Sequence, residues 1–159
     1  MAKVRISTQA ESKADPASVF RLLRDVATWP RWSLFDSFQL ERRGQPDPLG
    51  VGSIHIFITK VSRAREEVVE VVPNKHLSYI LLAGFPFRDY KADVDLDPLP
   101  NGGTLIRWRS SFYAKHFGTA WFWKLFMQKV LRDISRQLAR AAEDPAMVAS
   151  AEELSPPPH

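Results

Sequence analysis

The chain has 159 residues, 45% hydrophobic and 25% charged, a balance typical of one soluble globular domain with a real core. It contains no cysteine, which excludes disulfide frameworks and zinc–thiolate sites. The formal charge of +4 equals the excess within residues 120–142, where five basic residues face one acidic residue. Such a charged helix face is usually solvated, so we expect no nucleic-acid partner despite the pI of about 9.6.

The N-terminal segment carries no recognisable targeting signal. Residues 1–16 lack the apolar core of a signal peptide, and no apolar run approaches the length that spans a bilayer. Together with the absence of cysteine, this favours a cytoplasmic protein without a transmembrane segment.

A strand and a helix are predicted before residue 33. Val4, Ile6 and Thr8 alternate with polar residues, which is the period of a half-buried strand. Asp15 and Pro16 resemble an N-cap and a first helical residue, and apolar residues follow at helical spacing. The segment TWPRW, 28–32, is expected to end this helix at Pro30 and to bring two tryptophans to its end, where such rings more often seal a core.

Most of the chain between 38 and 113 shows the two-residue period of strands. The pattern is clearest at 89–97, where apolar residues alternate with charged ones. Residues 54–59 are apolar on both sides, so the direction of His55 is left open. Turn-rich segments at 44–52 and 98–103 separate neighbouring strands. The expected strands are 38–40, 54–59, 61–72, 77–83, 89–97 and 104–113.

One long amphipathic helix is predicted over 119–142, roughly 35 Å in length. Thr119 is a candidate N-cap, and Asp144-Pro145 is expected to stop the helix. The first two turns are apolar nearly all round and need cover on more than one side. Residues 144–159 show no periodicity and little apolar surface, which predicts a mobile tail after a domain that spans 1–143.

This order of elements predicts an α+β fold. Consecutive strands with short links form an antiparallel meander, and its inner face and the apolar stripe of the last helix must bury each other. We therefore expect a curled sheet of six to seven strands wrapped around the C-terminal helix, with two short helices after the first strand. Bulky rings at the near end of that helix favour a cavity between helix and sheet.

Four segments resemble the polyketide cyclase/dehydrase and lipid-transport superfamily (SRPBCC), also called START-like or Bet v 1-like. They are DPASVFRLLRDVATWPRW (15–32), PLGVGS (48–53), VVEVVPNKHLSY (68–79) and YKADVDLDPLPNGGTLIRW (90–108). With the long C-terminal helix, the resemblance covers about 1–143. It implies the helix-grip fold with a hydrophobic cavity, but no single activity, because members bind lipids, sterols, quinones or hormones, or cyclise polyketides.

Strand phase identifies the polar side chains expected to face the cavity. Tyr79, Arg88, Tyr90 and Ser110 share strand faces with apolar residues, and His55 is a further candidate whose direction is open. Arg88 could pair with an anionic group of a ligand, and His55 is the best acid-base candidate because imidazole titrates near neutrality. The expected apolar lining is Phe57, Trp108, Phe112, Trp123, Met127 and Val130.

Metal and cofactor sites are not expected. The four histidines are scattered along the chain without the close spacing of zinc sites. Asp93, Asp95 and Asp97 are reminiscent of a calcium loop, but Pro98 and Thr104 stand where that loop has Gly and Glu. The three aspartates are better interpreted as the solvated face of a strand.

The first hypothesis is a protein, monomeric or homodimeric, that binds a hydrophobic or aromatic small molecule in the cavity. Tyr90, Arg88 and Ser110 would orient its polar end. The alternative is a cyclase or aromatase of polyketides that uses His55, Tyr90 or Arg88 for proton transfer, so the question of enzyme or binding protein stays open. A third hypothesis is a protein partner or a peripheral membrane contact at the basic face of the last helix.

Overall fold

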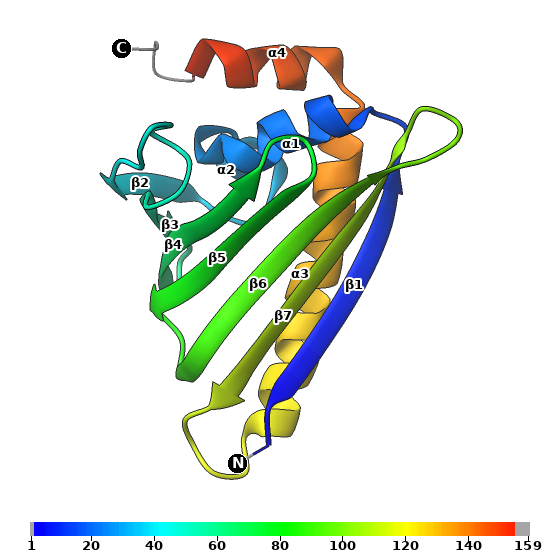
Figure 1. Cartoon of the computed structure of the whole chain (residues 1–159). Coiled ribbons are helices and arrows are strands. Elements are labelled where there is room, and N and C mark those ends of the chain that lie inside the picture. The colour runs from blue at the N-terminus through cyan, green and yellow to red at the C-terminus, as the bar shows by residue number, and fades with distance from the viewer. Residues whose placement is uncertain (1, 155–159) are drawn as a thin grey trace.

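A seven-stranded antiparallel sheet curls around one long helix, α3, in the computed structural model, which describes residues 2–154 and the side chains of 2–151 (Figure 1). The strand order is β1-β7-β6-β5-β4-β3-β2. This confirms the α+β helix-grip fold expected from the sequence. The strands are β1 (Val4–Ser12), β2 (Ser37–Arg42), β3 (Ile54–Ile58), β4 (Arg63–Val72), β5 (His76–Ala83), β6 (Phe87–Pro98) and β7 (Thr104–Ala114), and the helices are α1 (Pro16–Arg24), η1 (Val26–Thr28), α2 (Trp29–Trp32), α3 (Ala120–Ala142) and α4 (Pro145–Leu154).

The first helix after β1 begins at the predicted residue, but it ends earlier than predicted and two further short helices follow it. Asp15 Oδ1 accepts a hydrogen bond from the Ser18 backbone N–H at 3.2 Å, which caps α1. Helix α1 ends at Arg24 rather than at Pro30, because Asp25 caps the short 3₁₀ helix η1 and takes extended backbone angles. Pro30 is then tolerated within the first turn of α2, where its missing N–H has no helical partner to lose.

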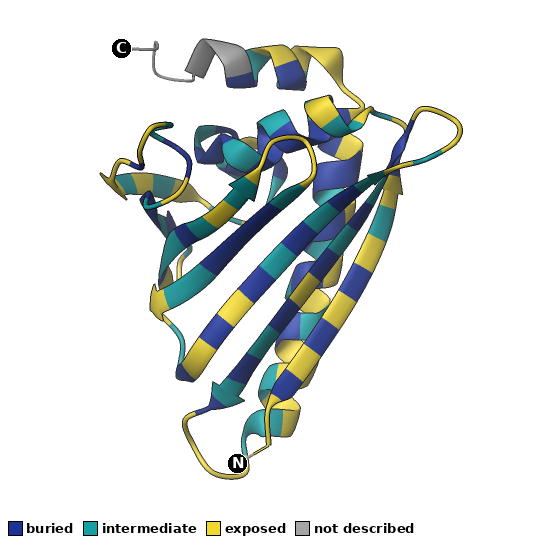
Figure 2. Ribbon diagram, viewed as in Figure 1, coloured by how far each residue is buried: buried dark blue, intermediate teal, exposed yellow. Residues whose placement is uncertain are grey.

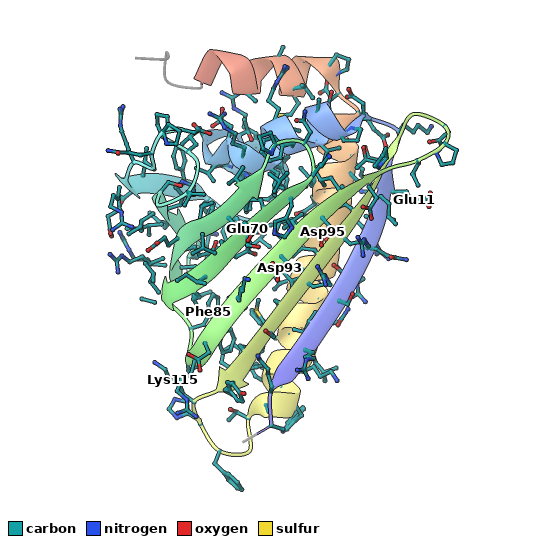
Figure 3. All side chains as sticks on the ribbon, viewed as in Figure 1. Glu11, Glu70, Phe85, Asp93, Asp95 and Lys115 are labelled. Atoms are coloured by element: carbon teal, nitrogen blue, oxygen red, sulfur yellow. The ribbon has the colours of Figure 1, made fainter. Side chains whose placement is uncertain are left out.

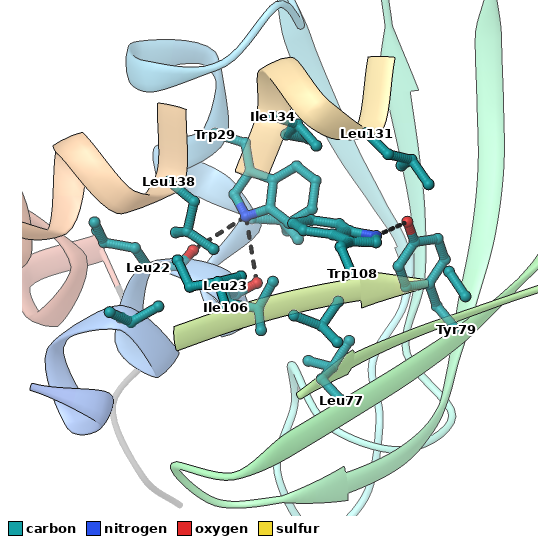
Figure 4. Close-up of a cluster of buried hydrophobic side chains, with 14 of the residues drawn as sticks. Leu22, Leu23, Trp29, Leu77, Tyr79, Ile106, Trp108, Leu131, Ile134 and Leu138 are labelled. Atoms are coloured by element: carbon teal, nitrogen blue, oxygen red, sulfur yellow. Dashed lines mark hydrogen bonds between the residues drawn. The ribbon is translucent and has the colours of Figure 1, made fainter. Parts of the chain in front are cut away.

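The core lies between the second half of α3, the sheet and the short helices. Leu138, Ile106 and Trp108 are fully buried, and Leu131 and Ile134 pack in the same cluster (Figure 4). Trp29 Nε1 donates to the Leu22 carbonyl at 3.1 Å, which fixes this indole at the end of α1. Figure 2 shows the buried stripe of α3 facing the sheet. Burial of this stripe, rather than helix propensity, holds α3 in place.

The two ends of α3 differ from the expectation. Thr119 does not cap the helix, because its hydroxyl donates instead to the His116 carbonyl at 2.7 Å. The chain beyond 144 is also not an irregular tail over 145–154, where it forms α4. Val148 and Ala151 are buried and join the main core, and α4 lies against α1 (Figure 1). The rest of the predicted tail, 155–159, lies outside the described residues.

Candidate ligand-binding cavity

A cavity of about 590 Å³ lies between the concave face of the sheet and the first half of α3. Of the predicted lining residues, Tyr79, Tyr90, Trp123, Met127 and Val130 line it. Its walls are mostly apolar, and further walls come from α2, from the loops before β2 and β4, and from the turn after β5. This volume is within the range of sites that enclose small organic ligands, about 300–1,000 Å³.

Aromatic contacts between the turn after β5 and α3 frame one side of the cavity. Gly84 has a φ of 117°, and a Cβ there would lie 2.4 Å from the Arg63 carbonyl oxygen, so only glycine fits this turn. The turn brings Phe85 to within 6.1 Å of Trp123 and 6.4 Å of Phe126, between ring centroids. Figure 3 shows Phe85 at the end of the sheet that is far from α4.

Three predicted lining residues lie behind the cavity wall instead. Trp108 and Phe112 are fully buried, and Phe57 lines only a small adjoining pocket of about 20 Å³. Trp108 nevertheless affects the cavity, because its Nε1 donates to the Tyr79 hydroxyl oxygen at 3.1 Å (Figure 4). That bond fixes the position of the Tyr79 hydroxyl.

The inward direction expected for Arg88 is wrong. The pairing of β6 with β7 shifts register between Arg88 and Lys91, and Asp89 in this bulge has a φ of 53°. The extra residue reverses the alternation, so Phe87 and Tyr90 are both buried while Arg88 is exposed. Arg88 is therefore not part of the cavity wall.

Ser110 and His55 face the interior but do not line the main cavity. Ser110 is buried, and its Oγ has no hydrogen-bond partner among the described residues. His55 lines the small adjoining pocket, and its Nε2 likewise has no partner among them. Desolvation lowers the pKa of His55 from 6.5 to about 4, so its imidazole is neutral at pH 7.

The sequence reasoning missed Glu66, the acidic group on the inner cavity wall. Glu66 lies on β4 directly opposite His55 on β3, and it lines both the cavity and the small adjoining pocket. Desolvation raises the pKa of its carboxyl from 4.5 to about 8. One signal could have found it: Glu66 stands between Ala64 and Val68, which are both buried, so the two-residue period points it inward.

Tyr79 and Tyr90 complete the polar part of the cavity wall. Burial raises the pKa of both hydroxyls, and the nearby carboxyl of Glu66 raises them further. Both phenols therefore stay protonated and are hydrogen-bond donors at pH 7. The inner wall of the cavity thus combines apolar side chains with one carboxyl and two phenols from adjacent strands.

Family comparison agrees with this architecture. The family model for polyketide cyclase / dehydrase and lipid transport matches residues 3–143. The chain belongs to this family. A comparison with proteins of curated function finds no match.

Solved structures similar to this family member share its fold at low sequence identity. XoxI from Bacillus cereus matches with a TM-score of 0.73 at 16% identity, over 89% of this chain and 96% of that one. A START superfamily protein from Mycobacterium smegmatis matches with a TM-score of 0.74 at 15% identity, over 87% and 97%. Ara h 8.0201 matches with 0.62 at 14% identity, over 84% and 96%. At these identities the likeness supports the helix-grip fold alone.

Proposed function

We propose that this protein binds a hydrophobic or aromatic small molecule in the cavity between the sheet and α3. The observation that carries the proposal is an apolar cavity of about 590 Å³ with only a few convergent polar groups on its inner wall. An apolar cavity of this size leaves its lining without packing partners, so a guest that supplies those contacts gains dispersion and hydrophobic free energy. Membership of a family described by lipid transport agrees with such a ligand.

The alternative of a cyclase receives less support from the geometry. Proton transfer from a reacting carbon needs a base near neutrality that faces the substrate. Arg88 is exposed, His55 lies behind the main cavity, and the pKa of Tyr90 is raised by burial. Holding a ligand is the function that the arrangement supports best.

Thermal shift with a panel of lipids and aromatic metabolites tests the proposal. A ligand that binds only the folded state must raise the melting temperature. The control variant is Val130→Trp, which fills part of the cavity from α3, so a ligand held in the cavity should stabilise the wild type but not this variant. A panel that stabilises neither protein, or both equally, contradicts the proposal.

A further inference from the structure

The polar groups of the cavity come together from three adjacent strands. Glu66 on β4, Tyr79 on β5 and Tyr90 on β6 all line the cavity. Among the described residues, no hydrogen bond or ion pair is found for the Glu66 carboxyl, although most other carboxyls of the sheet have a cationic partner. Glu66 is half-buried, and a carboxyl on an apolar cavity wall is costly to leave without a partner.

Within the described part of the chain, no unpaired cation faces Glu66 from the elements around it, so its protonated carboxyl can donate a hydrogen bond to a ligand. His55 on β3 and the two tyrosines are neutral at pH 7, and the residues of α3 that line the cavity are apolar. Arg24 lines the small adjoining pocket with Glu66 but pairs with Asp47 at 2.6 Å, and Asp36 and Lys60 lie in outer loops. The Tyr79 hydroxyl oxygen accepts from Trp108 Nε1, and the Tyr79 hydroxyl is also hydrogen-bonded to that of Tyr90. Among these three groups, Glu66 is therefore the one whose carboxyl is left to pair with a ligand.

Resting on the proposed binding function, we infer that Glu66 donates a hydrogen bond to a carbonyl oxygen at the polar end of the ligand. The raised pKa of Glu66 supports this, because a carboxyl with a pKa of about 8 is mostly protonated at pH 7. A cationic ligand is the competing chemistry, since it would bind the ionised carboxylate instead. The two kinds of ligand respond to pH in opposite ways. As pH rises through 8, the affinity for a ketone should fall and the affinity for a cation should rise.

Three naphthalene probes of similar shape separate these chemistries. They are 2-acetylnaphthalene, its hydrocarbon analogue 2-isopropenylnaphthalene, and the permanent cation (2-naphthylmethyl)trimethylammonium. Affinities are measured from about pH 6 to about pH 9.5 on the wild type, Glu66→Gln and Glu66→Leu. At about pH 6 we expect the wild type to bind the ketone about fivefold more tightly than the hydrocarbon, because one hydrogen bond contributes an affinity gain of this size. At about pH 9.5 this preference should vanish, because the carboxyl is then ionised.

The variants decide the role of Glu66. Glu66→Gln should keep the ketone preference at every pH, since an amide N–H donates regardless of pH, and Glu66→Leu should lose it throughout. Equal affinity for ketone and hydrocarbon in all three proteins overturns the role of Glu66 but leaves the binding function standing. Tighter binding of the cation with rising pH overturns the carbonyl assignment, and absence of binding by any probe counts against the binding function itself.

A second, independent observation concerns the surface around the cavity mouth. Four of the ten exposed large hydrophobic side chains of the described residues line the cavity, and three more lie in the first turns of α3 or just before it. The four are Leu34, Val61, Phe122 and Phe126, and the three are Phe117, Trp121 and Leu125. Val61 and Phe117 are 94% and 95% exposed, and Trp121 and Leu125 are 67% and 65% exposed. We call this set the apolar rim. Soluble proteins rarely concentrate so much apolar surface without a partner.

Part of the rim is a cluster of rings in contact, and lysines flank it in the sequence. Trp121, Phe122 and Phe126 are joined by ring contacts of 6.2–6.3 Å between centroids, and Phe122 and Phe126 also line the cavity. Three lysines and no acidic residue occur between 114 and 130. Figure 3 shows Lys115 at the same end of the molecule as Phe85, beyond the start of α3. Exposed Trp, Phe and Leu flanked by lysine are typical of helices that lie in a membrane interface.

We propose that the apolar rim docks on an anionic lipid bilayer and opens the cavity toward the acyl region. No helix within the described residues is both long and apolar enough to cross a membrane, so the contact is peripheral. Charge complementarity favours this occupant over a second copy of the chain, whose equally basic rim would repel it. The rim differs from the basic face of the second half of α3, which carries Arg132, Arg136 and Arg140.

Vesicle co-sedimentation tests the docking. Wild-type protein should bind phosphatidylserine–phosphatidylcholine vesicles more tightly than phosphatidylcholine vesicles. Trp121→Glu/Leu125→Glu should weaken binding about tenfold or more, because two apolar side chains no longer enter the interface. The matched control Arg132→Glu/Arg136→Glu keeps the rim intact and should retain most of the binding. Both variants change exposed positions, and unchanged thermal unfolding verifies that each is folded.

Three outcomes would overturn the docking proposal. The first is that wild-type protein binds neither kind of vesicle. The second is that the arginine variant, and not the rim variant, loses binding, which would assign the contact to the basic face. The third is a dimer in size-exclusion chromatography with light scattering that the rim variant abolishes, which would make a second copy the occupant.

Discussion

The two halves of α3 differ sharply although they form one continuous helix. In the second half Leu131, Ile134 and Leu138 are buried against the sheet and the short helices, and Leu131 and Ile134 close the inner end of the cavity. In the first half Phe122, Leu125 and Phe126 are 40–65% exposed, and Phe122 and Phe126 line the cavity. The first half is the richer of the two in apolar residues, so apolar content alone does not explain why it is the less buried half.

Hydrogen bonds to β1 explain where the packed half begins. The Thr8 and Ser135 hydroxyls lie 3.1 Å apart, and Ser12 Oγ donates to the Ala139 carbonyl at 2.7 Å. These small side chains bring α3 close to the sheet edge, whereas the bulky rings of the first half hold it away. One end of the helix therefore stabilises the fold, and this leaves the other end free to enclose a ligand.

Leu138→Ala should produce the largest loss of stability. Leu138 is fully buried in the packed half, and truncation of such a side chain leaves a cavity that costs about 2–5 kcal/mol. Urea unfolding followed by circular dichroism measures the loss. Ligand binding by the folded fraction should be unchanged, because Leu138 does not line the cavity. A loss below about 1 kcal/mol would mean that the packed half is not what holds α3.

Glu66→Gln should change the pH dependence of stability. Folding raises the pKa of Glu66 from 4.5 to about 8, so the folded state binds more protons than the unfolded state between these values. The contribution of Glu66 to the free energy of unfolding therefore falls as pH rises through this window, by up to about 1.4 kcal/mol per pH unit. The variant lacks this fall and should be the more stable protein at pH 8. Parallel stability curves for the two proteins would show that the carboxyl is not desolvated.

The elements that follow from local pattern were predictable from the sequence. The stripe of α3, the start of α1 and the strand alternation of β6 each depend on residues within a few positions of one another. Helix α4 was missed although Asp144-Pro145 repeats the Asp15-Pro16 signal, and the Asp144 side chain accepts from the Ala146 N–H at 3.0 Å. Asp15-Pro16 predicts a helix start and Asp144-Pro145 a helix stop. In the structure Asp144-Pro145 both follows the end of α3 and begins α4.

The candidate site was less predictable, because its composition depends on register and on distance from α3. A single extra residue at Asp89 moved Arg88 from the interior to solvent. Trp108 and Phe112 are inward residues as expected, but each is covered by rings that line the cavity: Trp108 contacts Trp29 and Tyr79, and Phe112 contacts Tyr90. The alternation of residues along a strand predicts which side chains point inward. The position of the cavity depends instead on how closely α3 approaches the sheet, and these segments are far apart in the sequence.

His55→Phe should remove an acid-sensitive contribution to stability. The pKa of His55 falls from 6.5 to about 4 on folding, so the unfolded state binds more protons between these values. The contribution of His55 to the free energy of unfolding therefore falls as pH drops through this window, again by up to about 1.4 kcal/mol per unit. The measurement compares the slopes of the free energy of unfolding against pH in the variant and the wild type. A change in packing that is independent of pH does not alter these slopes. Because Glu66 acts in the opposite direction between 4.5 and 6.5, the slope of Glu66→Gln should be steeper than that of the wild type there.

Phe126→Ala should have the smallest effect on stability and a large effect on binding. Phe126 is 40% exposed and lines the cavity beside Phe85, so truncation removes little buried area and should cost less than about 1 kcal/mol. The same change removes a ring from the cavity wall and should weaken binding of whichever compound gives the largest thermal shift. Leu138→Ala is the matched control on the same helix, since it should do the reverse. If both truncations affect stability equally, the two halves of α3 are not distinct in energy, and the hollow end is only a loosely packed part of the core.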